Sequence, residues 1–232
     1  TRSFVRSFAP DVVVTDIHER RLREKTEKLS SEFGREFSSY LLDVTDESAV
    51  RSVITDIAER KGRLDVLINN AGWSKIEPVA EMSSETWRRC LDVDLNGTFY
   101  TMRYALPIMQ AQRSGAIVNI SSIAAYETTA EHGAAYSAAK AGVLALTRVA
   151  AAENGRFGIR VNAIAPGLIY NEFLRRIYPD EFFEGYAEKR SLVGRVGRPE
   201  DVAALVSFLV GPEAGYITGE VYGISGGVYP VG

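Results

Sequence analysis

Tyr136 and Lys140 carry the sharpest chemical signal in the sequence. They stand four positions apart in a helix expected over residues 133–155, and positions at that spacing lie on one helix face. A lysine ammonium favours the ionised form of a nearby phenol, which would lower the pKa of Tyr136 from about 10 towards neutrality. Tyr136 could then act as a general acid or base. The alternative is an ordinary pair on a solvated helix face, although the neighbouring residues are small and apolar.

Two further polar residues fit that chemistry. Ser122 follows a strand expected over residues 116–121, and its hydroxyl could orient a carbonyl oxygen beside the phenol. Asn96 precedes Gly97 within an expected helical stretch, where glycine is unfavourable, so the sequence indicates a local kink with a water held by the amide. The alternatives are a turn or cap serine and an asparagine at a helix end.

The elements that must position these residues alternate along the chain as strands and helices. The expected strands lie at residues 12–16, 40–42, 65–69, 116–121, 159–165 and 221–224. The helical patterns lie at residues 18–33, 45–62, 84–113, 133–155 and 199–210. Because the strands are apolar on both faces, they are typical of a parallel sheet with helices on each side. The prediction is a single Rossmann-type doubly wound α/β domain over residues 1–232.

Such sheets bind ligands at the carboxyl ends of their strands, so the last residues of each strand carry the functional prediction. Asp16 ends the first strand, where a carboxylate can accept both hydroxyls of an adenosine ribose and repel a 2′-phosphate. It can equally cap the next helix. Asp43, after the second strand, could touch an adenine edge or cap a helix. Residues 69–72 suit a tight turn, with or without a ligand against the backbone.

Composition excludes several other classes of protein. A net charge of −3 provides no basic field for nucleic acid or an anionic membrane. The single cysteine, Cys90, fits a reducing compartment, and two histidines offer little material for zinc. No apolar run approaches the roughly 18 residues of a membrane span. We therefore expect a cytoplasmic protein with no metal, no nucleic-acid partner and no membrane partner.

In this order the motifs resemble those of the short-chain dehydrogenase/reductase family, over about residues 4–229. The resemblance is strongest to members of the 3-oxoacyl-acyl-carrier-protein reductase type. The matching segments are Asp16, Asp43-Val44-Thr45, Asn69-Asn70-Ala71-Gly72, Asn96, Ser122, Tyr136 with Lys140, Pro166-Gly167, residues 197–202 and residues 217–219.

The resemblance implies a role for each matching residue. Tyr136 would be the acid/base, Lys140 would bind the nicotinamide ribose and Ser122 would hold the substrate oxygen. Asn96 would support a proton-relay water. The residues that would bind the cofactor, NAD, are Asp16, Asp43, Val44, Asn70, Ala71, Gly72, Tyr136, Lys140, Pro166, Gly167 and Ile169.

The implied activity is an NAD-dependent oxidoreductase that transfers a hydride between nicotinamide and a secondary alcohol or ketone. Two alternatives stay open. One is an NADPH-dependent reductase of 3-oxoacyl groups on acyl-carrier protein or CoA. Asp16 argues against this alternative, because its carboxylate would repel the 2′-phosphate of NADPH. The other is a catalytically silent dinucleotide sensor, which should lack part of the polar set. The helix over 133–155 is apolar around much of its circumference, which together with the resemblance predicts a homotetramer.

The sequence departs from the family's pattern in several places. The glycine-rich phosphate loop, TGxxxGxG, and the strand before it are absent, and residues 2–9 look like the helix that follows that loop. We therefore expect about 15–25 further residues, the length of a βα unit, ahead of Thr1 in the full polypeptide. Asn171 stands where the family has threonine, and Ser225 where it often has aspartate.

Residues 168–195 correspond to the family's variable segment that covers the substrate. Its aromatic residues suggest an apolar, ring-bearing or acyl substrate, or a lid that packs on its own domain. Its cations could meet a carboxylate, CoA or a carrier-protein phosphate, or simply be solvated. The aromatic residues are Tyr170, Phe173, Tyr178, Phe182, Phe183 and Tyr186, and the cations are Arg175, Arg176, Lys189 and Arg190.

Overall fold

The strands pair in parallel in two groups. The computed structural model describes residues 11–127, 132–170, 174 and 179–229. One group has the order β3-β4-β5-β6, and the other consists of β1 and β2. The strands are β1 (Val13–Asp16), β2 (Ser38–Leu41), β3 (Val66–Asn69), β4 (Gly115–Ile120), β5 (Ile159–Pro166) and β6 (Val221–Ile224).

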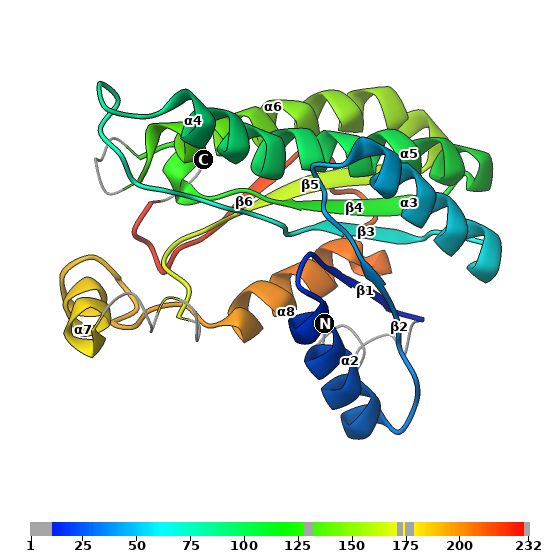
Figure 1. The fold of residues 1–232 in the computed structure, drawn as a ribbon, viewed down its shortest axis with the longest axis horizontal. Helices are drawn as coiled ribbons and strands as arrows, with labels where there is room; N and C mark the ends of the chain where they lie inside the picture. Colours follow the sequence, from blue (N-terminus) through cyan, green and yellow to red (C-terminus); the bar gives the residue numbers. More distant parts are fainter. Residues whose placement is uncertain (1–10, 128–131, 171–173, 175–178, 230–232) are drawn as a thin grey trace.

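Helices cover both faces of the four-stranded group (Figure 1). The helices α3, α5 and α6 lie over one face and α8 lies over the other, while α2 packs on β1 and β2. The α-helices are α2 (Glu19–Phe33), α3 (Glu47–Lys61), α4 (Ser84–Leu91), α5 (Gly97–Gln112), α6 (Ala134–Asn154), α7 (Asp180–Lys189) and α8 (Pro199–Val210). The shorter turns are η1 (Asp92–Asn96), η2 (Ile123–Ala125), η3 (Gly155–Phe157) and η5 (Pro212–Ala214).

The core lies on both sides of β4 and β5. On one side Met102 and Ile117 pack with Val161, and on the other Ile164 packs with Leu209 of α8. Both strands are buried over almost their whole length, as expected of central parallel strands. The sequence prediction of an α/β fold with parallel strands between helix layers is confirmed.

The single continuous sheet that the sequence predicted is divided between β1 and β3. No ladder of hydrogen bonds joins these two strands, and no strand lies between them, within the residues that the structure describes. The β1–β2 pair therefore relies on α2, through an apolar cluster that includes Leu29 and Phe37. The helix expected over residues 2–9 lies outside the described residues.

The stretch expected to be helical over residues 84–113 consists of three parts. The helix α4 ends at Leu91, a π-helical turn follows over Asp92–Asn96, and α5 begins at Gly97. The interruption that Asn96 and Gly97 predicted is therefore present. π-turns widen the helix locally and occur often at functional sites, because they turn a side chain out of the regular helical face. The side chain placed in this way is that of Asp94, which is fully buried.

Candidate active site

Three of the four predicted catalytic residues meet at the carboxyl end of β4. Ser122 lies two residues beyond that strand, and its hydroxyl is close enough to the Tyr136 phenol to act to lower the pKa of that phenol. The Ser122 oxygen also accepts the backbone N–H of Ala124, at 3.1 Å. Tyr136 and Lys140 lie one turn apart on α6, with the Lys140 Nζ 5.4 Å from the centroid of the Tyr136 ring. The chain therefore brings a hydroxyl, a phenol and an ammonium together.

Lys140 is anchored from two sides in the interior. Its side chain is 4 % exposed, and Nζ donates a hydrogen bond to the backbone oxygen of Ile120, at 3.0 Å. Nζ also lies 3.0 Å from Oδ1 of Asp94. The Lys140 backbone oxygen accepts the hydroxyl of Ser121, which ties α6 to the end of β4. A buried charge needs such partners, because an isolated one would be strongly destabilising.

Asn96, the fourth predicted catalytic residue, is not in this cluster. Its Nδ2 donates to Oδ1 of Asp92 at the other end of the π-turn, at 2.8 Å. The position beside Lys140 belongs instead to Asp94, two residues earlier. Asp94 takes this position because the π-turn, whose register the sequence did not reveal, points residue 94 inward. The role of Asn96 in holding a proton-relay water stays a prediction. A carboxylate between Val93 and Leu95 was the available signal, since a charge within an apolar stretch requires a buried partner.

The pKa of Tyr136 is raised above its usual value, contrary to the sequence-based expectation. Burial of the phenol is the largest cause, and the carboxylate of Asp94 adds to it. The ammonium of Lys140 and the hydroxyl of Ser122 act in the opposite direction without overcoming burial. Burial likewise raises the pKa of Asp94, against the opposing effect of Lys140. The environment of the phenol is thus set by a pair of opposite charges, not by a lone cation.

Gly72, at the end of the segment that follows β3, lies against this pair. A Cβ atom at this position would be 3.0 Å from Asp94 Oδ1 and 3.7 Å from Lys140 Nζ. The next residue, Trp73, donates its backbone N–H to Asp94 Oδ2, at 3.0 Å. Asn70 and Ala71, also predicted to line the cofactor, are exposed at the same strand end. The close approach that the sequence indicated for this turn is made to the catalytic cluster itself.

A buried hydrogen-bond network that the sequence analysis missed lies beneath the cluster. Asn69 donates to Asn119, at 2.8 Å, and accepts the hydroxyl of Thr101, at 2.6 Å. Asn119 in turn donates to the hydroxyl of Thr147 on α6, at 2.9 Å. A satisfied network of this kind fixes the positions of the elements that it joins, here β3, β4, α5 and α6. Polar residues inside apolar strands were its only sequence signal.

Asp16 lies at the carboxyl end of β1 and is already paired. Arg21 donates to both of its carboxylate oxygens, each at 2.6 Å, and the backbone N–H of His18 donates to Oδ1 at 2.9 Å. Partial burial acts to raise the pKa of Asp16, but the hydrogen bonds from Arg21 and His18 hold it below its usual value. Asp16 is not the cap of α2, because the N-cap position belongs to His18, whose backbone N–H Asp16 accepts. The carboxylate keeps acceptor capacity for a further donor.

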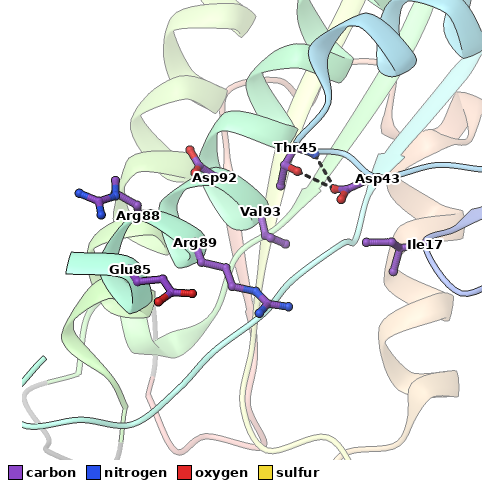
Figure 2. A pocket seen from close by; sticks show the side chains of 8 residues that line it. All are labelled: Ile17, Asp43, Thr45, Glu85, Arg88, Arg89, Asp92 and Val93. Atoms are coloured by element: carbon purple, nitrogen blue, oxygen red, sulfur yellow. Dashed lines mark hydrogen bonds between the residues drawn. The ribbon is translucent and has the colours of Figure 1, made fainter. Parts of the chain in front are cut away.

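A cavity of about 400 Å³ opens beside this strand end, as Figure 2 shows. Ile17 and Asp43 face Val93 and Arg89 across it. The full lining is Ile17, Asp43, Thr45, Glu85, Arg88, Arg89, Asp92 and Val93. Its volume lies within the range of small-molecule sites. Its lining is mostly charged, and Ile17 and Val93 are its apolar members.

Asp43 and Val44 take different positions at this cavity. Asp43 accepts hydrogen bonds from the backbone and the hydroxyl of Thr45, at 2.9 and 2.8 Å, so it closes the turn before α3. Val44 instead packs on the start of α5, where a Cβ on Gly97 would lie 2.7 Å from Val44 Cγ2. Asp43 therefore faces the cavity, and Val44 supports the wall behind it.

Pro166 and Gly167 lie at the carboxyl end of β5, on the other side of the cluster. The Gly167 N–H donates to the Ile224 oxygen, at 3.1 Å, and a Cβ on Gly167 would lie 2.9 Å from Ser225 Cα. Ile169 forms a parallel bridge with Gly197. Asn171 lies outside the described residues. The chain from β5 to β6 thus forms a tight wall where the nicotinamide was expected.

The substrate-covering segment packs largely on itself. Tyr170 and Phe182 both make edge contacts with Phe183, with ring centroids 5.0 and 5.6 Å apart. Arg190 pairs with the buried carboxylate of Glu127. Phe173, Arg175, Arg176 and Tyr178 lie outside the described residues. The rings that the structure describes therefore favour the alternative of a self-packed lid, and Arg190 serves to attach that lid to the wall after β4.

Comparisons with known proteins now decide the family. A family model described as enoyl-(acyl carrier protein) reductase matches residues 7–229. The chain belongs to the short-chain dehydrogenase/reductase family. It is thus an oxidoreductase that acts on CH–OH groups, as its relatives are.

The similar proteins include reductases of thioester-linked substrates. A Mycobacterium tuberculosis protein named (5R,7aS)-5-hydroxy-7a-methyl-1-oxo-2,3,5,6,7,7a-hexahydro-1H-indene-carboxyl-CoA reductase is 40 % identical over 93 % of this chain and 82 % of its own length. The 3-oxoacyl-[acyl-carrier-protein] reductase FabG of Thermotoga maritima is 38 % identical over 82 % of this chain and 76 % of its own. A solved structure described as ElxO with NADP bound is 33 % identical, with a TM-score of 0.87, over 98 % of this chain and 93 % of that one.

No helix in the described ranges is both long and apolar enough to span a bilayer. Nor does any group of three His, Cys, Asp or Glu side chains, in the part of the chain that the structure describes, come together as metal ligands would.

Proposed function

We propose that this short-chain dehydrogenase/reductase interconverts a secondary alcohol and a ketone with NAD(H), and that Tyr136 transfers the hydroxyl proton. The cluster of Ser122, Tyr136 and Lys140 is the observation that carries the proposal. The cavity at Asp43, beside the carboxyl end of β1, supports a site for the adenosine end of a dinucleotide. Bound nicotinamide would supply the hydride chemistry, and the chain supplies orientation and the proton path.

Each residue of the cluster has a defined task in the reaction. The Ser122 hydroxyl orients the substrate oxygen beside the phenol. In ketone reduction the Tyr136 O–H donates its proton to that oxygen as negative charge develops on it. In alcohol oxidation the phenolate takes the proton back. Lys140 would favour the phenolate by its charge and would hold the cofactor ribose.

The preference for NAD(H) over NADP(H) rests on Asp16. Its carboxylate would face a 2′-phosphate across a short distance and repel it. Arg21 reduces that repulsion, because its guanidinium already neutralises the carboxylate. We therefore expect a moderate preference. Steady-state kinetics with both cofactors test it, and an equal or better kcat/KM with NADP(H) would contradict it.

An NADPH-dependent 3-oxoacyl reductase is the second candidate. The similarity to FabG and to an NADP-bound structure favours it, as does the placement of Arg21 beside the expected 2′-hydroxyl. In that case Arg21 would leave Asp16 and pair with the phosphate, which suits the fork of a guanidinium. Replacing Arg21 with alanine would then abolish NADPH use selectively.

The substrate proposal is an apolar, ring-bearing or acyl ketone or alcohol. The names of the relatives support it, since they include a CoA-linked bicyclic substrate and an acyl-carrier-protein substrate. We also propose a homotetramer in the cytoplasm. A panel of alcohols and ketones, free and as CoA thioesters, identifies the substrate class by NADH absorbance, and light scattering tests the oligomeric state. Absence of turnover across the panel with either cofactor would favour the silent sensor.

A further inference from the structure

Asp94 is held by donors on both of its carboxylate oxygens. Oδ2 accepts the backbone N–H of Trp73, at 3.0 Å, and lies 3.8 Å from the thiol of Cys90. Oδ1 forms an ion pair with the Lys140 ammonium at 3.0 Å but has no well-aligned hydrogen bond within the described part of the chain. The side chain is fully buried. Two oxygens that each face a donor require a carboxylate, because an amide has only one acceptor oxygen.

The elements around Asp94 pack closely enough to fix its position. On α6, a Cβ at Gly142 would lie 2.9 Å from Leu95 Cδ2, so a larger residue at position 142 would press on the side chain next to Asp94. On the opposite side, a Cβ at residue 72 would lie 3.0 Å from Oδ1, so the turn at Gly72 closes that side of the carboxylate. The carboxylate therefore has little freedom to turn away from the ammonium.

We infer that Asp94 is a positioning residue, whose carboxylate fixes the Lys140 ammonium and offsets part of the charge that Lys140 exerts on the Tyr136 phenol. The inference rests on the proposed role of Tyr136 and adds the control of its ionisation. Among the residues that the structure describes, the charged or titratable groups that face the phenol are Lys140 on the same helix, Asp94 on the π-turn and Cys90 on α4.

Cys90 does not compete with Asp94 for this role. Its thiol is buried, and that burial raises its pKa to about 12, with a further contribution from the Asp94 carboxylate. Cys90 is thus uncharged near neutral pH, so the balance at the phenol is between one cation and one anion. Removing the anion and removing the cation should therefore shift Tyr136 in opposite directions.

The test is a pH titration of tyrosine labelled with ¹³C at Cζ, followed by NMR in the cofactor-free protein. The Tyr136 resonance is the one that disappears in Tyr136→Phe. Asp94→Asn should lower the pKa of Tyr136 by about one unit, the lower end of what a nearby charge produces. Lys140→Met should raise it. Asp94→Glu, which keeps the charge, should remain near the wild type.

Two control variants distinguish the effect of the lost Asp94 charge from a general disturbance of the fold. Asp65→Asn removes an exposed carboxylate that pairs with Arg63 ahead of β3, and should leave the titration unchanged. Asp94→Ser is a second neutral variant, and should move the titration in the same direction as Asp94→Asn. No shift in both neutral variants, or shifts of the same sign in Asp94→Asn and Lys140→Met, would overturn the inference.

The same series distinguishes the inference from the proposed function. If Tyr136→Phe keeps its turnover while Asp94→Asn still shifts the titration, the catalytic proposal fails and the charge balance stands. If Tyr136→Phe loses turnover and the Asp94 variants leave the titration unchanged, the catalytic proposal stands and Asp94 has only a packing role.

Discussion

The two ends of the expected cofactor site each contain a carboxylate paired with a cation, in very different surroundings. At the reaction end Lys140 and Asp94 are 3.0 Å apart, with side chains 4 % and 0 % exposed. At the nucleotide end Arg21 and Asp16 are 2.6 Å apart, with side chains 53 % and 21 % exposed. The shorter contact is the more exposed one, so the distance between the charges does not decide how strongly each pair acts on its surroundings. The burial of the pair decides it.

Burial decides what each pair can control. Charges interact strongly in the low-dielectric interior, so removing the charge of Asp94 or of Lys140 should strongly affect the ionisation of the Tyr136 phenol. An exposed pair is screened by water and salt and contributes about 0–1 kcal/mol. We therefore expect the buried pair to set the chemistry and the exposed pair to adjust which cofactor is preferred.

Tyr136→Phe should have the largest effect. It removes the proton donor and almost no volume, so turnover should fall by about 10²–10⁴-fold, the usual contribution of general acid–base catalysis. NADH binding, measured by fluorescence titration, should be nearly unchanged. Near wild-type turnover would show that Tyr136 is a packing residue.

Lys140→Met should lower both turnover and cofactor affinity. The ammonium is the cation nearest the phenol and the group expected on the nicotinamide ribose, so both kcat and the Kd for NADH should change by about tenfold or more. Lys61→Met, on the exposed end of α3, is the matched control. Unchanged NADH affinity in Lys140→Met would show that the Lys140 ammonium does not bind the nicotinamide ribose.

Asp16→Asn should change the preference between cofactors by a few fold to about tenfold in favour of NADP(H), since exposed charges contribute about 1 kcal/mol or less. The ratio of the two kcat/KM values measures this, and added salt should reduce the difference between Asp16→Asn and wild type. A preference that stays the same would mean that Asp16 acts only as the partner of Arg21.

A second exposed pair should have the smallest effect, and it concerns stability alone. Arg195 donates to both carboxylate oxygens of Asp201, at 2.7 and 2.9 Å, and Arg198 donates its backbone N–H at the start of α8. These hydrogen bonds, first of all that from Arg195, lower the pKa of Asp201 to about 2.

The sign of its pH dependence follows from that depressed pKa. The folded chain binds fewer protons than the unfolded chain between about pH 2 and 4, so stability from Asp201 is present above the unfolded pKa and is lost as the pH falls. Thermal melts should show Asp201→Asn slightly less stable near neutrality and converging with wild type towards pH 2. A difference that persists at the lowest pH would point to packing.

The sequence predicted most of what depends on regular spacing. Tyr136 and Lys140 could be paired because an α-helix places residues four apart on one face, and the strand ends placed Ser122 beside them. The sequence did not indicate that Asp94 would lie beside Lys140, because a π-turn changes the helical register and nothing in the sequence fixes where the extra residue enters. Arg20 and Arg21 both follow Asp16 closely, but the sequence could not tell which of them pairs with it, because long side chains at the start of a helix have many partners within reach.

The most direct test of the division between the two ends is one set of pH profiles of kcat/KM for alcohol oxidation, measured with both NAD and NADP for wild type, Asp94→Asn and Asp16→Asn. The account predicts that Asp94→Asn moves the ascending limb to lower pH with both cofactors and leaves their ratio unchanged. It predicts that Asp16→Asn changes the ratio of the kcat/KM values with NAD and NADP and leaves the ascending limb of the pH profile unchanged. A shifted limb in Asp16→Asn, or a changed ratio with an unmoved limb in Asp94→Asn, would contradict it.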